Sequence, residues 1–158
     1  MANDDFSNRS VAELAAQLET GKLTSRDLVE AVLAAAAERD GAIKAFLKLD
    51  AIKLRRLADE SDARRAAGRA LSPYDGIPVG IKDCIVAEGE SCSCASRILS
   101  NVISPYDATV VARLKQRGFI PTGRLNMDEF AMGSSCENSA FQKTANPDRK
   151  STRLNSSH

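Results

Sequence analysis

The sequence lacks several features that would assign it to a function class at once. Its 158 residues include no tryptophan and one histidine, and no apolar run approaches the roughly 20 residues that a membrane-spanning helix needs. Neither sign of charge prevails, because 22 lysines and arginines nearly cancel 21 aspartates and glutamates. We therefore expect no membrane association and no nucleic-acid-binding surface on the chain itself.

Four cysteines raise the question of a metal site or disulfides, but their spacing favours neither. Cys92 and Cys94 are separated by one residue, whereas zinc ligands are usually separated by roughly two to four. The lone histidine, His158, lies in a terminal segment of unusual composition. We expect reduced thiols and no metal, and the polar, acidic N-terminus, which is no secretory signal, indicates the cytoplasm.

The composition, 43% hydrophobic and 27% charged, is typical of a globular protein, and the length allows one domain or part of a larger one. Ser10 and Glu13 form a capping box that predicts a helix ending at Gly21, and Thr24 with Asp27 predicts a second helix to about Arg39. Strand patterns follow at 45–50, 77–81 and 119–123, with helices at 51–68, where Ile52, Leu54, Leu57 and Ala58 form the apolar face, and at 108–115, capped by Asp107.

Strand, helix and strand thus alternate twice, without internal repeats or a linker within residues 1–147. This alternation predicts an α/β layered fold preceded by two or three N-terminal helices.

One lysine stands out because of its position. The β-branched run Ile77–Ile81, bounded by glycine and proline, predicts a buried strand that ends at Lys82. An unpaired ammonium in an apolar setting costs several kcal/mol or loses its proton, which makes Lys82 a candidate base. On residue type alone, an ordinary strand-end lysine whose ammonium reaches water is the commoner alternative.

The C-terminal segment 148–158 reads DRKSTRLNSSH and contains one apolar residue and no periodicity. DNA encoding it resembles a common sequencing-library adaptor read in frame, so we expect an artefactual tail. Residues 1–147 would then be the N-terminal portion of one truncated domain. A genuine disordered C-terminus is the alternative.

Four segments resemble the amidase-signature family: DGIPVGIKD (75–83), CASRIL (94–99), PYDATVVARLK (105–115) and LNMDEFAMGSSCENSAF (125–141). The last segment is most similar to one branch of that family, the A subunits of the amidotransferases that act on Glu-tRNA(Gln) or Asp-tRNA(Asn). The resemblance covers about residues 10–147. It implies the N-terminal part of an α/β/α fold, a mixed sheet flanked by helices, with leading N-terminal helices.

In that family a serine, a cis-serine and a lysine form the catalytic triad, and Lys82 corresponds to the lysine. A neutral amine accepts a proton through the cis-serine, so that the second serine can attack an amide carbonyl. Neutrality requires burial, which we expect the run Ile77–Ile81 to supply. The resemblance also implies that Met132, Ser134 and Ser135 line the glutamine pocket, with a loop packed against the core as the alternative.

The parent protein implied by the resemblance is a glutaminase subunit that releases ammonia from glutamine through an acyl-enzyme. A partner B subunit would use ATP and Mg²⁺ to amidate the mischarged tRNA, and a small C subunit would brace the pair. The glutaminase subunit itself would need no cofactor.

The serines of the family lie in GGSSGGS and GGSIR segments, and neither string occurs in this chain. We therefore expect the chain by itself to lack amidase activity and, as a truncated sheet with open edges, to be poorly soluble or loosely packed. Cys84 stands where the family commonly has asparagine. Two alternatives remain open: a stand-alone amidase acting on small amides, and a non-catalytic remnant.

Overall fold

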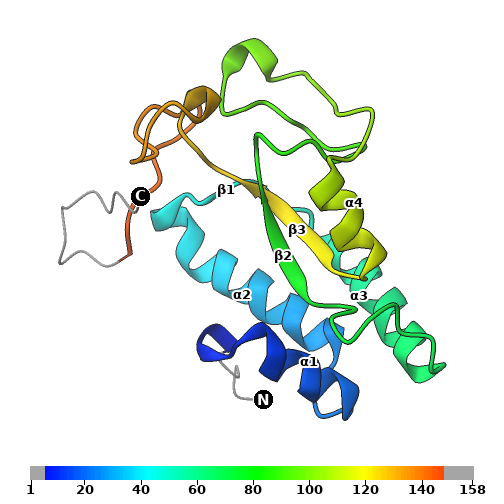
Figure 1. Ribbon diagram of the computed structural model, residues 1–158. Helices are drawn as coiled ribbons and strands as arrows, with labels where there is room; N and C mark the ends of the chain where they lie inside the picture. The colour runs from blue at the N-terminus through cyan, green and yellow to red at the C-terminus, as the bar shows by residue number, and fades with distance from the viewer. Residues whose placement is uncertain (1–5, 148–158) are drawn as a thin grey trace. The chain divides into compact units, whose positions relative to one another are not determined.

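A computed structural model describes residues 6–147 (Figure 1). Its α-helices (α), 3-10 turns (η) and strands (β) are, in chain order, η1 (Phe6–Asn8), α1 (Val11–Glu19), α2 (Ser25–Ile43), β1 (Phe46–Lys48), α3 (Ala51–Ala66), β2 (Pro78–Lys82), η2 (Arg97–Leu99), α4 (Thr109–Gln116), β3 (Ile120–Leu125) and η3 (Glu129–Ala131). Two helices therefore precede a β-α-β-α-β order, which confirms the predicted α/β class. The tail at 148–158 lies outside the described residues.

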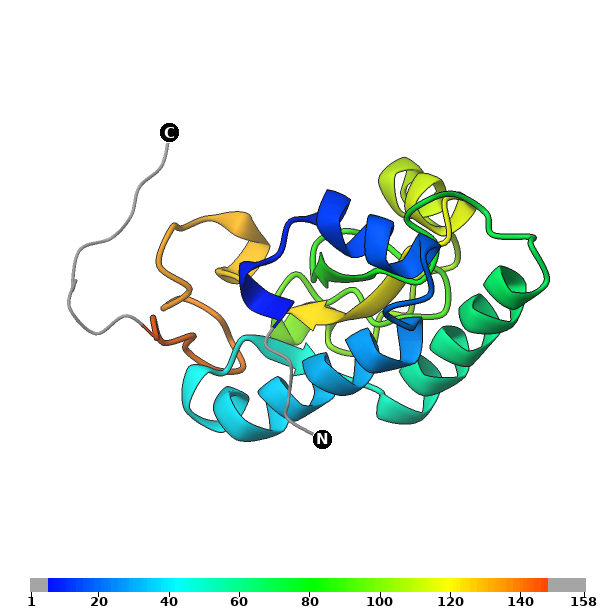
Figure 2. The same cartoon turned by 90° about the horizontal axis from the view of Figure 1, so that it is seen from below.

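The N-terminal helices begin where their side chains predict. Ser10 Oγ accepts a hydrogen bond from the Glu13 N–H, and the Glu13 carboxylate accepts one from the Ser10 N–H at 2.7 Å. Thr24 and Asp27 make the same reciprocal pair in front of α2. Between the two helices Gly21 adopts φ +69°, a left-handed conformation that glycine tolerates best, and the chain turns there from α1 into α2 (Figure 2).

The strands form one mixed sheet in the order β1-β3-β2. β1 runs antiparallel to β3, with Phe46 opposite Leu125 and a bulge before Lys48. β2 and β3 are parallel, because one hydrogen bond joins the residue before β2 to the start of β3 (Ile120 N–H to Ile77 O, 2.9 Å) and another joins the residue after β2 to the end of β3 (Asp83 N–H to Leu125 O, 3.1 Å). A mixed sheet of this kind agrees with the fold expected from the sequence.

The chain divides into two compact units, each built from three segments. Of the described residues, the first unit comprises 6–38, 50–80 and 112–122, and the second comprises 39–49, 81–111 and 123–147. The interior of the first unit is largely apolar: Leu14, Leu18, Leu23, Leu28 and Ile77 form a cluster against which Phe6, Tyr74 and Phe119 pack. The rings of Tyr74 and Phe119 stack with centroids 5.6 Å apart.

The interior of the second unit is different, because polar side chains occupy much of it. Its buried apolar residues are Ile81, Ala87, Cys92, Ala95, Val111 and Met127, and its buried polar residues are Asp83, Ser93, Ser96, Ser104, Arg124, Asn126 and Asp128. Buried polar groups are costly unless they are hydrogen-bonded, and most of these side chains bond to nearby backbone groups or to one another.

Some expectations about individual positions were wrong. Ile52 does not belong to the buried face of α3, since 81% of it is exposed, whereas Leu54 and Ala58 are buried. β2 is not a uniformly buried strand: Ile81 is buried, but Gly80 is exposed. Successive residues of a strand point to opposite faces of the sheet, and at this end of β2 only the face of Ile81 is buried. None of the helices in the described part of the chain has the length and apolar character that a membrane span requires.

Candidate active site

Lys82 is the last residue of β2, as the sequence predicts, but its environment differs from the expected one. Its side chain is exposed, whereas the preceding Ile81 is buried. Within the described part of the chain, the run Ile77–Ile81 does not bury Lys82, so that expectation is wrong. The physical reason is the strand period of two, which points neighbouring side chains to opposite faces of the sheet.

Asp83, the next residue, is 1% exposed and anchors the end of β2. Its Oδ2 accepts hydrogen bonds from the Ser93 hydroxyl and from the backbone N–H groups of Ser93 and Ala95, both at 3.1 Å. Its Oδ1 accepts a hydrogen bond of 3.3 Å from Nε of Arg124 on β3. A carboxylate held by charge and by backbone donors can hardly rotate, so the backbone carrying Lys82 is held in one position.

The main chain of Asp83 is equally engaged. Its carbonyl accepts the backbone N–H of Cys94 at 3.3 Å and the Cys92 thiol at 3.4 Å. Arg124 also donates from Nη2 to the Ile85 carbonyl at 2.8 Å, while its Nη1 is the one buried side-chain nitrogen or oxygen without a hydrogen-bond partner in the part of the chain that the structure describes.

A second buried carboxylate, Asp128, organises the loop that follows β3. Its Oδ2 accepts the backbone N–H groups of Ser135 (3.1 Å) and Cys136 (2.9 Å), and its Oδ1 accepts that of Asn138 (2.9 Å). Gly133 lies so close that a Cβ atom there would be 2.5 Å from Asp128 Cγ. Asp128 therefore sets the conformation of the segment in which Met132, Ser134 and Ser135 lie.

Lys82 and Asp128 interact electrostatically. Burial alone would raise the pKa of the Asp128 carboxyl, but the backbone hydrogen bonds from Asn138, Cys136 and Ser135 and the positive charge of Lys82 outweigh it and hold the pKa below its usual range. Ser135 therefore contacts this carboxylate through its N–H, and the charge of Lys82 acts on the same group.

The other two predicted pocket residues lie in this loop but are open to solvent. Met132 is 72% exposed and Ser134 is exposed, whereas Ser135 is half-buried and its hydroxyl donates to Glu137 at 3.3 Å. An exposed Met132 does not fit a loop that packs its side chains against a core. The role of these three residues in substrate binding stays a prediction.

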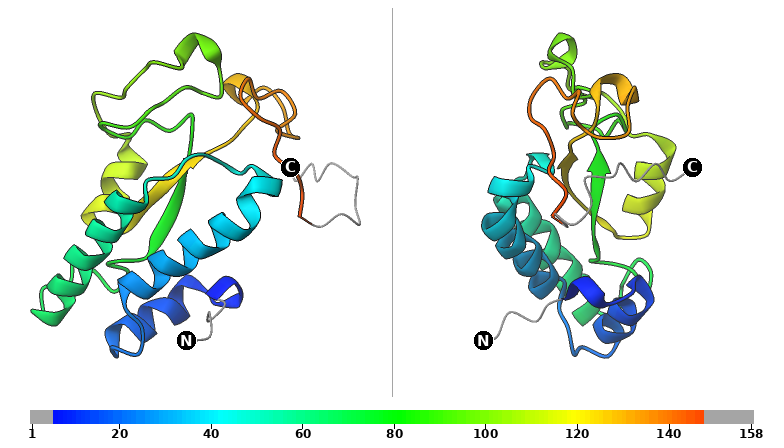
Figure 3. Two further views of the ribbon diagram at one scale, coloured as in Figure 1. Left: turned by 180° about the vertical axis from the view of Figure 1, so that it is seen from behind. Right: turned by 90° about the vertical axis from the view of Figure 1, so that its left-hand side faces the viewer.

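Hydrogen bonds join this loop to the segment that follows β2. The backbone N–H groups of Phe130 and Ala140 donate to the carbonyls of Cys94 and Ala95, each at 2.9 Å. Cys94 and Ala95 both adopt φ +51°, an uncommon conformation for residues with a side chain. The two loops, at 83–108 and 126–147, accordingly lie side by side where β2 and β3 end (Figure 3).

In the described residues, no three His, Cys, Asp or Glu side chains are placed to share an ion. All four cysteines are free thiols. Burial, as the largest cause, raises the pKa of both the Cys92 and Cys94 thiols.

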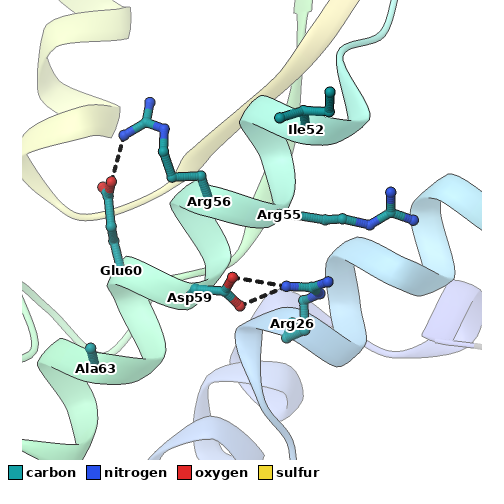
Figure 4. Close-up of a pocket in the computed structure, with 7 residues that line it drawn as sticks. All are labelled: Arg26, Ile52, Arg55, Arg56, Asp59, Glu60 and Ala63. Carbon is teal, nitrogen blue, oxygen red and sulfur yellow. Dashed lines mark hydrogen bonds and ion pairs between the residues drawn. The ribbon is translucent and has the colours of Figure 1, made fainter.

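A surface pocket of about 610 Å³ lies between α2 and α3, in the first unit (Figure 4). Each of its arginines already has a carboxylate partner, in the pairs Arg26–Asp59 (2.8 Å), Arg55–Glu30 (2.8 Å) and Arg56–Glu60 (2.5 Å). Hydrogen bonds from Arg55 and Arg26 lower the pKa of Glu30 to about 2. Because its charges are neutralised within the protein, we assign no ligand to this pocket.

Asp83, Arg124 and Asp128 are the residues of the site that sequence analysis missed. The position of Asp83, directly after a strand with an apolar run, could have indicated a buried carboxylate that needs hydrogen-bond partners. The partners were beyond reach, because Ser93, Ala95 and Arg124 are distant in sequence and only the folded sheet and loops bring them to Asp83.

Comparison with protein-family models gives a match of residues 27–155 to the family described as Amidase. The A subunit of the glutamyl-tRNA(Gln) amidotransferase of Leptospira interrogans (serovar Lai) is 51% identical over 144 residues, which cover 91% of this chain and 30% of the relative. That of Roseiflexus sp. is 53% identical over 130 residues, 82% of this chain and 26% of the relative. The chain therefore spans less than a third of the length of these curated relatives.

A solved structure gives the same relationship. The A subunit of the glutamyl-tRNA(Gln) amidotransferase of Thermotoga maritima superposes with a TM-score of 0.71 at 35% identity, over 91% of this chain and 28% of that one.

Proposed function

The chain belongs to the amidase family, and on that premise we propose that it is the N-terminal part of the glutaminase subunit of a tRNA-dependent amidotransferase. Identity of 51% to one such protein, over 91% of the chain, supports this assignment. The structural observation that carries it is the position of Lys82 at the end of β2, directly before Asp83, whose carboxylate is held by Arg124, Ser93 and the N–H of Ala95.

In this proposal Lys82 is the base of the hydrolytic site. It takes a proton from the nucleophilic serine through a second serine, the nucleophile attacks the carboxamide carbon of glutamine, and ammonia leaves from an acyl-enzyme that water then hydrolyses. Both serines would come from the further chain that the longer relatives possess. The same further chain would cover the exposed Lys82 and give it the dry environment that a neutral amine needs.

Loop 126–147 would supply the glutamine pocket. Met132 and Ser134 are exposed on a loop whose backbone is held by hydrogen bonds to Asp128, so both side chains are accessible to a ligand. Met132 offers an apolar contact for the glutamine methylenes, and the Ser134 and Ser135 hydroxyls offer hydrogen bonds to its polar groups.

The remaining parts of the proposal concern the assembly. The ammonia would pass to a B subunit that uses ATP and Mg²⁺ to convert Glu-tRNA(Gln) or Asp-tRNA(Asn) to the amide, while a C subunit would brace the complex, in the cytoplasm where charged tRNAs are used. This polypeptide would hold no cofactor. Its nearly balanced charge supports tRNA being held by the partner.

The test uses the intact parent protein with its partners and measures glutamate release from glutamine. Lys82→Ala should lower kcat by at least about 100-fold, the minimum usually attributed to a general base. Lys48→Ala is the matched control, because Lys48 is likewise an exposed strand-end lysine, half of whose side chain is accessible. Hydrolysis at the wild-type rate in Lys82→Ala would remove this lysine from the mechanism.

A stand-alone amidase is the second candidate, and one observation favours it. The peptide amidase of Stenotrophomonas maltophilia superposes with a TM-score of 0.74 at 32% identity, over 80% of this chain and 26% of that one. Hydrolysis of small amides by the intact parent protein, at a rate that added B and C subunits do not change, would favour this alternative. The 158-residue chain alone should hydrolyse neither substrate, and turnover by it would contradict the assignment of the serines to further chain.

A further inference from the structure

Three of the four cysteines lie around a single peptide group, the one that joins Asp83 to Cys84. The carbonyl oxygen of this peptide accepts the Cys92 thiol at 3.4 Å and the backbone N–H of Cys94 at 3.3 Å. Cys84 supplies the nitrogen of the same peptide. Cys92, Cys94 and Cys84 are thus all within one or two contacts of this one peptide group.

From this geometry we propose that Cys84 and Cys94 are a reversible modification site, at which a small disulfide such as oxidised glutathione drives an intrachain disulfide. This inference goes beyond the proposed glutaminase role and does not depend on it.

Bond lengths limit how far apart the pair can be. The hydrogen bond from Cys94 N–H to the Asp83 carbonyl places the Cα atoms of Cys84 and Cys94 no more than about 7.5 Å apart. Disulfides need a separation of roughly 4.4–6.8 Å, so a small shift or none brings the pair into range. The corresponding limit for Cys84 and Cys92 is looser, because there the contact runs through the end of the Cys92 side chain.

Exposure sets the order in which the thiols react. Cys84 is exposed, Cys94 is half-buried and Cys92 is 6% exposed. Burial raises the pKa of the Cys94 and Cys92 thiols, which disfavours their thiolates as first attackers. A reagent from solution therefore meets Cys84 first, and Cys94 acts second.

The chemistry is two successive thiol–disulfide exchanges. The Cys84 thiolate attacks one sulfur of oxidised glutathione, forms a mixed disulfide and releases one glutathione thiolate. The Cys94 thiolate then attacks the Cys84 sulfur and releases the second glutathione. Two protein thiols are oxidised, one glutathione disulfide is reduced to two glutathione thiols, and the protons of the cysteines end on those thiols.

The modification would act at the site already described. Cys94 adopts φ +51°, its carbonyl holds the Phe130 N–H of loop 126–147, and Cys84 directly follows Asp83. A covalent link between Cys84 and Cys94 would fix the end of β2 to the residue whose carbonyl accepts the hydrogen bond from that loop. In a reducing compartment such a disulfide would form transiently, as redox-sensing disulfides do.

The experiment equilibrates the purified intact parent protein with oxidised glutathione, traps free thiols with an alkylating reagent and follows Cys84, Cys92, Cys94 and Cys136 by mass spectrometry. The expected result is a loss of two of the four free thiols, with Cys84 and Cys94 joined in a monomeric chain, and full recovery with dithiothreitol. Cys84→Ser should abolish the loss, and because Cys84 is exposed this variant leaves the interior intact.

Two further variants serve as controls. Cys136→Ser removes the cysteine of loop 126–147, which is not part of the cluster, and should leave the loss of two thiols unchanged. Cys92→Ser keeps a hydroxyl donor for the Asp83 carbonyl and should also leave it unchanged. A disulfide between Cys84 and Cys92, a link between two chains, or four thiols that persist at high oxidised glutathione would each overturn the proposal.

Discussion

The two units of the chain differ in the polarity of their buried side chains. In the first unit leucines and Ile77 pack with aromatic rings. In the second, the buried Asp83 is hydrogen-bonded to β3 and to loop 83–108, and the buried Asp128 is hydrogen-bonded within loop 126–147. An apolar interior accepts different arrangements of similar volume, whereas a polar one is stable only in arrangements that pair nearly all of its polar groups. The unit that carries Lys82 is therefore the one whose geometry is more narrowly defined.

Two buried aspartates that flank β2 make the comparison concrete. Asp75, in the first unit, receives both Nε (2.9 Å) and Nη2 (2.6 Å) of Arg64, whose side chain is 30% exposed. Asp83, in the second unit, accepts a hydrogen bond from Nε of Arg124 but none from its Nη atoms, and the Arg124 side chain is 2% exposed. Water can solvate the first guanidinium if its partner is lost, but cannot reach the second.

The largest expected effect therefore follows from Asp83→Asn, which leaves the Arg124 charge buried and uncompensated. We expect a loss of about 3–5 kcal/mol in the free energy of opening the second unit. Hydrogen exchange of peptides from residues 81–111 and 123–147 measures it. Asp75→Asn is the matched control and should cost less in its own unit, because Arg64 retains access to water; an equal or larger cost would contradict the comparison.

Leu28→Ala tests the apolar interior of the first unit. Leu28 is 3% exposed within the apolar cluster, so the truncation leaves a cavity and should cost about 3 kcal/mol. Exchange should accelerate in α1 and α2 of the first unit. The neighbouring Val32→Ala, at a half-buried position of the same helix, should cost less. Equal costs at the two positions would show that burial does not govern this interior.

Acid should weaken both units through their carboxylates. Burial would raise the pKa of Asp75, but hydrogen bonds from Arg64, the Leu71 N–H and Ser61 outweigh it and lower the pKa, as the loop amides do for Asp128. A carboxyl whose pKa is lower in the folded state stabilises the protein fully above its unfolded value of about 4, and this stabilisation disappears as the pH falls through the folded value.

The unfolding midpoint measured in urea should therefore be constant from about pH 5 to 7 and fall below about pH 4. In hydrogen exchange, Asp128→Asn should reduce the acid dependence of protection in peptides of loop 126–147 and leave that of other peptides unchanged. A midpoint that rises on acidification would contradict the assigned direction of the shifts.

The smallest effect is expected from Gly133→Ala. The added Cβ would lie 2.5 Å from Asp128 Cγ, so the loop has to shift and its hydrogen bonds to Asp128 weaken. The amides of Ser135, Cys136 and Asn138 should exchange faster while those of the first unit do not change. Gly41→Ala is the control, because a Cβ there meets nothing within 4 Å.

Sequence patterns predicted the parts of the fold that depend on neighbours in the chain. The capping pairs at Ser10 and Thr24, the strand at 46–48 and the alternation of strands and helices all follow from local chemistry. The exposure of Lys82 and Ile52 did not follow, because it depends on which face of an element finds a neighbour. The Asp83 network was equally out of reach, since its members meet only in three dimensions.

The order of the sheet has a consequence for synthesis on the ribosome. β3 is the central strand, yet it is the last of the three to be made, so β1 and β2 have no pairing partner until about residue 125 has emerged. Strands that wait unpaired during translation are open to pairing with other nascent chains. The helices α1 and α2, which precede them, are capped by their own side chains and can form first. Chaperone dependence of this chain should accordingly be concentrated in the interval between the synthesis of β1 and that of β3.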